Sequence, residues 1–185
     1  RAAAVAGIRT RAYLSTAFGC PFEGHVPVFR VVELAKALLD LGAFEVAISD
    51  TIGVAHPAQV REVLDALDAA IPREAIALHF HDTRGMAIAN VLAAVESGIR
   101  LFHSSSGGLG GCPYAPGASG NVATEDLLYL LQGFGLASGV SLDAVCEASA
   151  PLASIVRHPL PSRYLQAWLA ARAPGNGDSV MRKSS

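Results

Sequence analysis

The chain has 185 residues, of which 51% are hydrophobic and 16% are charged, and its formal net charge is −2. This composition is typical of a globular domain that buries a core, and it excludes an intrinsically disordered chain. The sequence has no basic run, which argues against a nucleic-acid partner, and no apolar run long enough to span a membrane. The three cysteines, Cys20, Cys112 and Cys146, are too scattered for a disulfide framework, so we expect a reducing compartment.

Strand and helix patterns alternate along most of the chain. Short apolar runs predict strands, and apolar residues spaced three and four apart predict helices. The predicted strands cover residues 8–15, 44–49, 75–81 and 99–104, and the predicted helices cover 28–41, 57–70, 85–97, 124–132 and 141–157. Thr124 is the expected N-cap of its helix. We expect residues 1–158 to form one catalytic domain and residues 159–185 to form a C-terminal extension with a loose tail.

Four strand–helix units in a row predict an α/β protein with a parallel sheet covered by helices. Both a doubly wound open sheet and part of a (β/α)8 TIM barrel fit this periodicity. In such a barrel the active site lies where the strands end, and polar residues do follow the predicted strands here, at Asp50, at 79–82 and beyond Ser104. A complete barrel needs eight strands and about 250 residues, so four strands look like the second half of one.

Two histidines at the end of the third predicted strand suggest a metal site. Side chains at i and i+2 of a strand point to the same side, so His79 and His81 project together, as two imidazole ligands of one ion require. Cys112 and Asn121 follow a run of glycines further along the chain. A lone cysteine is more often a small apolar residue, and an asparagine often ends a turn. The combination nevertheless favours a metal-centred active site.

The glycine run comprises Gly107, Gly108, Gly110 and Gly111. Its spacing matches neither the dinucleotide-binding fingerprint nor the phosphate-binding loop of nucleotide hydrolases, which needs a lysine that is missing here. We therefore interpret Gly108, Gly110 and Gly111 as parts of a flexible loop that folds over a substrate.

Four segments of the sequence together resemble the hydroxymethylglutaryl-CoA lyase family. They are Ser15-Thr-Ala-Phe-Gly-Cys-Pro-Phe-Glu-Gly24, Ser49-Asp-Thr-Ile-Gly53, His79-Phe-His-Asp-Thr-Arg-Gly85 and the stretch from Gly107 through Asp126. The His-x-His-Asp element alone indicates only the wider group of metal-dependent lyases and Claisen-condensing enzymes. The glycine loop with its Cys-Pro-Tyr, followed by Gly-Ala-Ser-Gly-Asn, makes the likeness to the lyases much more specific.

The resemblance implies retro-Claisen cleavage of 3-hydroxy-3-methylglutaryl-CoA to acetyl-CoA and acetoacetate, with Mg²⁺ or Mn²⁺ as cofactor. It also implies an acyl-CoA substrate as the partner and a possible homodimer of the full-length enzyme. By motif position, the implied metal ligands are His79, His81 and Asn121, and the implied catalytic residues are Cys112, Asp50 and Glu125.

The sequence departs from the family pattern at two places. The family's remaining metal ligand is an Asp in an Arg-Asp-Gly segment on the first strand, beside an essential Arg, and this chain contains no such segment. Relatives also usually carry Asp where this chain has His103, before Ser104-Ser105. Any support that this carboxylate gives the site is therefore in question.

Two alternatives remain open at the level of sequence. One is a related acyl-CoA-condensing synthase, against which the Cys112 loop argues. The other is a catalytically inert half-barrel fragment. The alanine-rich composition favours a bacterial cytoplasm, with a mitochondrial matrix as the second option.

Overall fold

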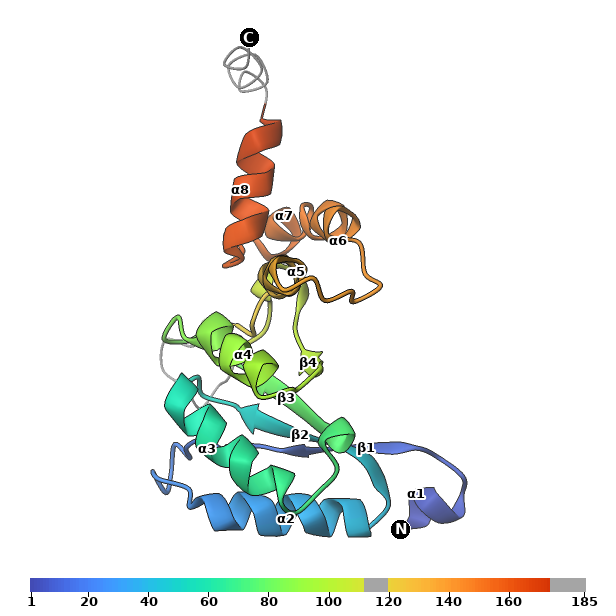
Figure 1. Cartoon of the computed structure of the whole chain (residues 1–185). Helices are drawn as coiled ribbons and strands as arrows, with labels where there is room; N and C mark the ends of the chain where they lie inside the picture. Colours follow the sequence, from blue (N-terminus) through green and yellow to red (C-terminus); the bar gives the residue numbers. More distant parts are fainter. Residues whose placement is uncertain (112–119, 174–185) are drawn as a thin grey trace. The chain divides into compact units, whose positions relative to one another are not determined.

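The computed structural model describes residues 1–111 and 120–173, and Figure 1 shows the order of the elements. In chain order they are α1 (Ala2–Val5), β1 (Thr10–Leu14), α2 (Val28–Asp40), β2 (Ala43–Asp50), α3 (Pro57–Asp68), the 3₁₀ turn η1 (Arg73–Ala75), β3 (Ile76–Phe80), α4 (Ala87–Glu96), β4 (Leu101–His103), the 3₁₀ turn η2 (Ser106–Gly108), α5 (Thr124–Gly133), α6 (Leu142–Ser149), α7 (Leu152–Val156) and α8 (Arg163–Arg172). None of the helices in these ranges is long and apolar enough to cross a membrane.

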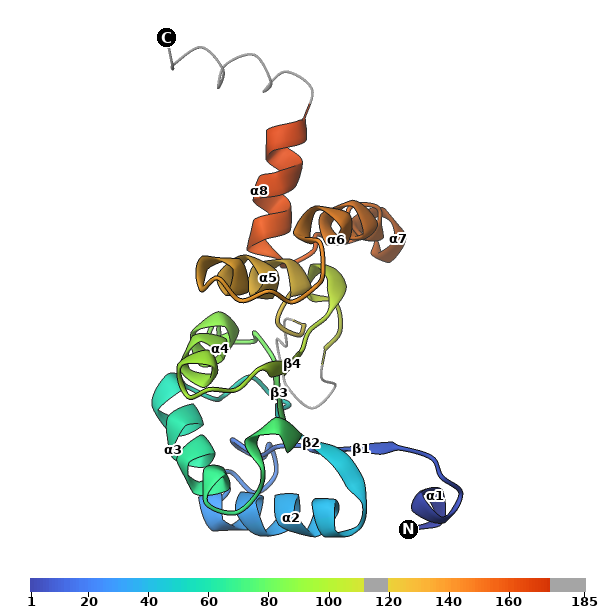
Figure 2. The same ribbon diagram turned by 45° about the vertical axis from the view of Figure 1, so that its right-hand side comes forward.

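The four strands form one parallel sheet in the order β1-β2-β3-β4. Helices α2, α3 and α4, which connect them, follow the same side of the sheet (Figures 1 and 2). A doubly wound sheet places helices on both faces and reverses its strand order at one point. Sequential order with one-sided helices is instead the arrangement of a barrel wall. The predicted alternation of parallel strands and covering helices is confirmed.

Alternation along the strands separates two faces of this sheet. Val46 and Ile48 on β2, with Leu78 on β3, are completely buried and belong to the core. Because side chains alternate along a strand, Ala47 and His79 lie on the opposite face. The register pairs Ser49 with His79 and His79 with His103 across three strands. We call this second face the inner face. It carries polar groups toward the ends of the strands.

The chain divides into two compact units, and each is described by itself. The first comprises residues 1–104 and 110–122 and contains the sheet, and the second comprises residues 105–109 and 123–185. In the described part of the second unit, buried Leu128, Leu142, Cys146 and Leu165 pack into a small core. The end of the catalytic domain expected at residue 158 stays a prediction.

Three details of the C-terminal helices differ from expectation. The helix predicted over 141–157 is interrupted at Pro151, which lacks an N–H to donate, and becomes α6 and α7. Helix α5 has Ala123 as its N-cap, so the prediction of Thr124 was wrong by one residue. The Thr124 N–H instead donates to the Ser105 carbonyl at 2.9 Å.

Helix α8 was not predicted. Its N-terminus is held by the carboxylate of Asp126, which accepts hydrogen bonds from the Ser162 hydroxyl at 3.0 Å and from the Tyr164 N–H at 2.7 Å. These partners are more than thirty residues from Asp126 in sequence, so local periodicity could not reveal this cap.

Gly53 should tolerate no side chain. Its φ is +62°, and a Cβ there would lie 2.7 Å from the Thr83 Cβ and 2.9 Å from the Thr83 nitrogen. We predict that Gly53→Ala lowers the free energy of unfolding by about 1–2 kcal/mol for the left-handed backbone and by a further ~1–3 kcal/mol for the clash. Gly85→Ala is the matched control, because φ is +69° but nothing lies within 4 Å. Urea unfolding curves that show equal losses for both variants would contradict this close approach.

Candidate active site at the strand ends

The two histidines of β3 lie together, as their spacing predicts. The ring centroids of His79 and His81 are 5.2 Å apart. His81 is only 6% exposed, and the Nδ1 atoms of both rings are buried without a hydrogen-bond partner among the described residues. Buried polar atoms normally have partners, so these two nitrogens are candidates for binding a group.

Asn121 is brought beside this pair by backbone pairing. Residues 120–122 run along the end of β3: the Asp82 N–H donates to the Gly120 carbonyl at 3.0 Å, and the Val122 N–H donates to the Phe80 carbonyl at 2.9 Å. Asn121 is thereby bridged directly opposite His81. The structure thus gathers His79, His81 and Asn121, which are separated by forty residues of sequence, at the end of one strand. Their role as metal ligands stays a prediction.

Electrostatics keep the histidine pair neutral. Burial, with the neighbouring His81 and His103 rings, lowers the pKa of His79 from the usual 6.5 to about 4. Burial also lowers the pKa of His81. A neutral imidazole has a nitrogen lone pair available to a cation, whereas the imidazolium form does not. The pair is therefore in the form that a metal site needs near neutral pH.

Asp50 ends β2 beside the histidine strand. The register sets it opposite Phe80 rather than opposite His79. Its buried carboxylate accepts hydrogen bonds from the Val54 N–H at 2.9 Å and the Ala55 N–H at 3.0 Å, and burial raises its pKa. Asp50 therefore holds the loop between β2 and α3. The Asp50 carbonyl accepts a hydrogen bond from the His81 N–H at 3.3 Å, so its backbone contacts the histidine pair while its carboxylate is bound by the loop. The catalytic role of Asp50 stays a prediction.

Glu125 belongs to the second unit, where it is completely buried. Both of its carboxylate oxygens accept the Gly107 N–H, at 2.9 and 3.0 Å. Gly107 has a φ of +64°, and a Cβ there would lie 2.6 Å from the Leu160 side chain. Glu125 thus fixes the first glycine of the loop.

The three glycines expected to cover a substrate fall into both units. Gly108 is buried in the turn η2 of the second unit. Gly110, in the first unit, packs so closely on Asn121 that a Cβ would lie 2.5 Å from the amide nitrogen. Gly111 has open space around it. The close approach gives Gly110 a defined task, which is to leave room for the Asn121 amide.

Cys112, the remaining predicted catalytic residue, lies outside the described residues. A pocket of about 510 Å³ lies elsewhere in the first unit, in the loop between β1 and α2, and is lined by Cys20 and His25 among others. The candidate ligands do not line it.

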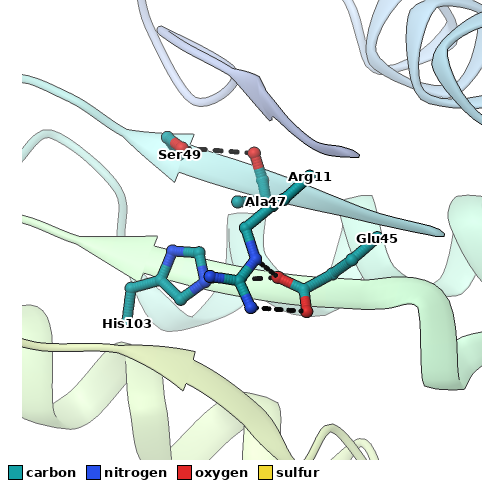
Figure 3. A network of polar contacts seen from close by, with 5 residues as sticks. All are labelled: Arg11, Glu45, Ala47, Ser49 and His103. Atoms are coloured by element: carbon teal, nitrogen blue, oxygen red, sulfur yellow. Dashed lines mark hydrogen bonds and ion pairs between the residues drawn. The ribbon is translucent and has the colours of Figure 1, made fainter. Parts of the chain in front are cut away.

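The inner face also carries a polar cluster that sequence reasoning did not assemble. Arg11 on β1 makes a two-pronged ion pair with buried Glu45 on β2, with N–O distances of 2.5 and 3.1 Å. The Nε2 of His103 on β4 lies 3.3 Å from a Glu45 oxygen (Figure 3). Burial, and next the charge of Arg11, lower the pKa of His103, and the hydrogen bond to Glu45 only partly offsets them. The sequence offered one signal for this cluster, which is the charged residue Glu45 inside an otherwise apolar strand.

A family model described as HMGL-like matches residues 1–151. The chain belongs to this family. It is 52% identical over 163 residues to the hydroxymethylglutaryl-CoA lyase YngG of Bacillus subtilis, covering 88% of the chain and 54% of that relative. Relatives named as mitochondrial and as cytoplasmic lyases also match.

Solved structures give the same picture. The HMG-CoA lyase of Bacillus subtilis superposes with a TM-score of 0.87 at 50% identity, covering 91% of this chain and 56% of that one. The lyase of Acinetobacter baumannii, in complex with coenzyme A and 3-methylmalate, gives a TM-score of 0.81 at 40% identity, covering 94% and 55%. This HMGL-like chain thus spans about half the length of the relatives that it matches. Its four strands are part of a (β/α)8 barrel.

The lowered pKa of His79 predicts a pH dependence of stability. Between pH 6.5 and about 4 the unfolded chain protonates this histidine and the folded chain does not. The unfolded state then binds more protons, so His79 reduces stability as pH falls through this window and has no further effect below it. In the metal-free chain, an NMR titration should give a midpoint near 4 for His79. A midpoint near the usual 6.5 for His79 would refute the assigned environment.

Proposed function

We propose that this chain supplies about half of the active site of a hydroxymethylglutaryl-CoA lyase. The observation that carries the proposal is the convergence of His79, His81 and Asn121 at the strand ends, in a chain about half identical to named lyases. In a barrel, the strand ends are where active sites are built. The remaining strands would contribute the carboxylate and the arginine that this sequence lacks.

The residues present fit a divalent cation. Two neutral imidazoles with unpartnered Nδ1 atoms and a neighbouring amide side chain offer a mixed, open ligand set. Such a set suits Mg²⁺ or Mn²⁺ better than it suits a closed structural zinc site. When bound there, the ion would polarise the substrate oxygens and stabilise their negative charge.

The protein's own side chains would carry out the rest of the chemistry. A general base would take the proton of the tertiary hydroxyl, the electron pair of the neighbouring C–C bond would pass to the acetyl-CoA enolate as that bond breaks, and acetoacetate would depart. The Cys112 thiol would then donate a proton to the enolate carbon, because a thiol with an ordinary pKa near 8.5 is still protonated at neutral pH. Glu125 would hold the glycine segment that precedes Cys112 through the Gly107 N–H.

A chimera tests the proposal directly. This segment would replace the matching part of the Bacillus subtilis relative, so that the barrel is complete. We expect Mg²⁺- or Mn²⁺-dependent release of acetoacetate from 3-hydroxy-3-methylglutaryl-CoA. His79→Ala or His81→Ala should weaken metal binding by more than ~10- to 100-fold, which is the cost of losing a residue that only orients a ligand.

The isolated chain is the control for the chimera. It should have little activity, because loss of a preorganised charged group costs about 100- to 1,000-fold each. Normal turnover by the segment alone would show that the missing half is not needed. A folded chimera that binds metal but releases no acetoacetate would favour the condensing synthase or the inert fragment instead.

In the same chimera, Cys112→Ser should fold normally and lose most of the lyase activity. Cys20→Ser is the matched control and should lose little, since Cys20 lies in the β1–α2 loop and lines a pocket to which the histidine pair does not contribute. Initial rates of acetoacetate release and thermal unfolding give the two readouts. Turnover of Cys112→Ser within about twofold of the parent would remove the thiol from the mechanism.

The partner and the compartment follow from the same argument. The coenzyme A bound to the Acinetobacter relative supports an acyl-CoA substrate, and a homodimer remains part of the proposal. Relatives occur in bacteria, in mitochondria and in the cytoplasm. Among these compartments, we propose a bacterial cytoplasm for this protein.

A further inference from the structure

His103 is held in place by a chain of polar contacts across the inner face. Arg11 binds both carboxylate oxygens of Glu45, and Glu45 in turn lies 3.3 Å from Nε2 of His103. Arg11 and Glu45 are register partners on neighbouring strands. The contacts thus reach from β1 through β2 to β4, across the position of β3.

His103 can reach Glu45 because the side chains between them are small. His103 shares a row with His79 and Ser49, whereas Glu45 lies four residues before Ser49 on its strand. The row between is formed on β2 and β3 by Ala47 and Ala77, which are paired and completely buried. Two methyl groups leave room for the imidazole to lean back toward the carboxylate.

The contact with Glu45 decides which ring nitrogen carries the proton. A carboxylate only accepts hydrogen bonds, so in the neutral ring Nε2 is the donor and Nδ1 keeps a lone pair. That Nδ1 is buried and has no partner among the described residues. In Figure 3 it faces away from Arg11 and Glu45, toward the side on which the strands end. The His79 ring is the neighbour of His103 on β3, with its centroid 6.0 Å from that of His103.

We propose that His103 contacts the substrate, with Nδ1 accepting a hydrogen bond from the hydroxyl of a 3-hydroxyacyl-CoA. The inference rests on the proposed function for the identity of the ligand. An acceptor requires a donor, and the hydroxyl is the donor on the acyl group of this substrate class, because the carboxyl group is ionised at neutral pH. Glu45 and Arg11 are positioning residues that fix the ring and its tautomer.

The test compares two ligands that differ by one hydroxyl group. The metal-free chimera, kept in EDTA to prevent turnover, is titrated calorimetrically with 3-hydroxy-3-methylglutaryl-CoA and with 3-methylglutaryl-CoA. We expect the parent to bind the hydroxylated ligand about tenfold more tightly, which is the size of one hydrogen bond to a buried group. His103→Phe keeps an aromatic ring without the acceptor, so the two affinities should become equal.

A conservative variant separates contact from folding. His103→Gln offers an amide N–H to Glu45 and an oxygen to the ligand, so it should retain most of the preference. His25→Phe, the same substitution at an exposed histidine, should leave the preference unchanged. If His103→Phe does not fold, His103→Leu provides the same loss of acceptor.

The outcomes are distinct. An unchanged ratio of the two affinities in His103→Phe or His103→Leu, with both ligands weakened equally, would overturn the contact and leave His103 a packing residue. A parent chimera that releases acetoacetate but shows no preference for the hydroxylated ligand would also overturn it while leaving the proposed function intact. No acetoacetate from a folded, metal-loaded parent would instead overturn the proposed function.

Discussion

Backbone pairing at the end of β3 is the constraint on which the candidate site depends. The hydrogen bonds from Asp82 to Gly120 and from Val122 to Phe80 extend the sheet beyond its last regular residue. They fix Asn121 opposite His81 through the main chain. Backbone pairs of this kind tolerate sequence change in the side chains, so the geometry of the site is set by main-chain register rather than by the ligands themselves.

The glycines follow from that pairing. Gly110 has a φ of +107°, and its lack of a Cβ lets the chain pass against the Asn121 amide. Gly107 has its own requirement in the second unit, where Leu160 and the Glu125 carboxylate enclose it. The same short run thus uses glycine for close approach in both units. Each of these glycines thus meets its own steric requirement, and the run is more than a general source of flexibility.

The polar groups of the inner face divide into paired and unpaired atoms. Glu45 is compensated by Arg11, as a buried carboxylate must be. The Nδ1 atoms of His79, His81 and His103 lack such compensation among the described residues, and burial lowers the pKa of all three rings. Neutral rings with unused lone pairs are costly for folding and useful for binding, because a ligand can replace the hydrogen bonds that folding left unmade.

The sequence by itself determined the strand–helix alternation and the common side of His79 and His81, because both depend on local periodicity. The motifs around those residues also carried the likeness to the lyase family. Only the tertiary structure decided the rest. It brought the Asp50 carbonyl to the His81 N–H, a contact between strands that local periodicity does not record. It also joined Arg11, Glu45 and His103, whose separation of up to ninety-two residues leaves no periodic trace. Local patterns record which elements form, whereas contacts between elements depend on how those elements align in space.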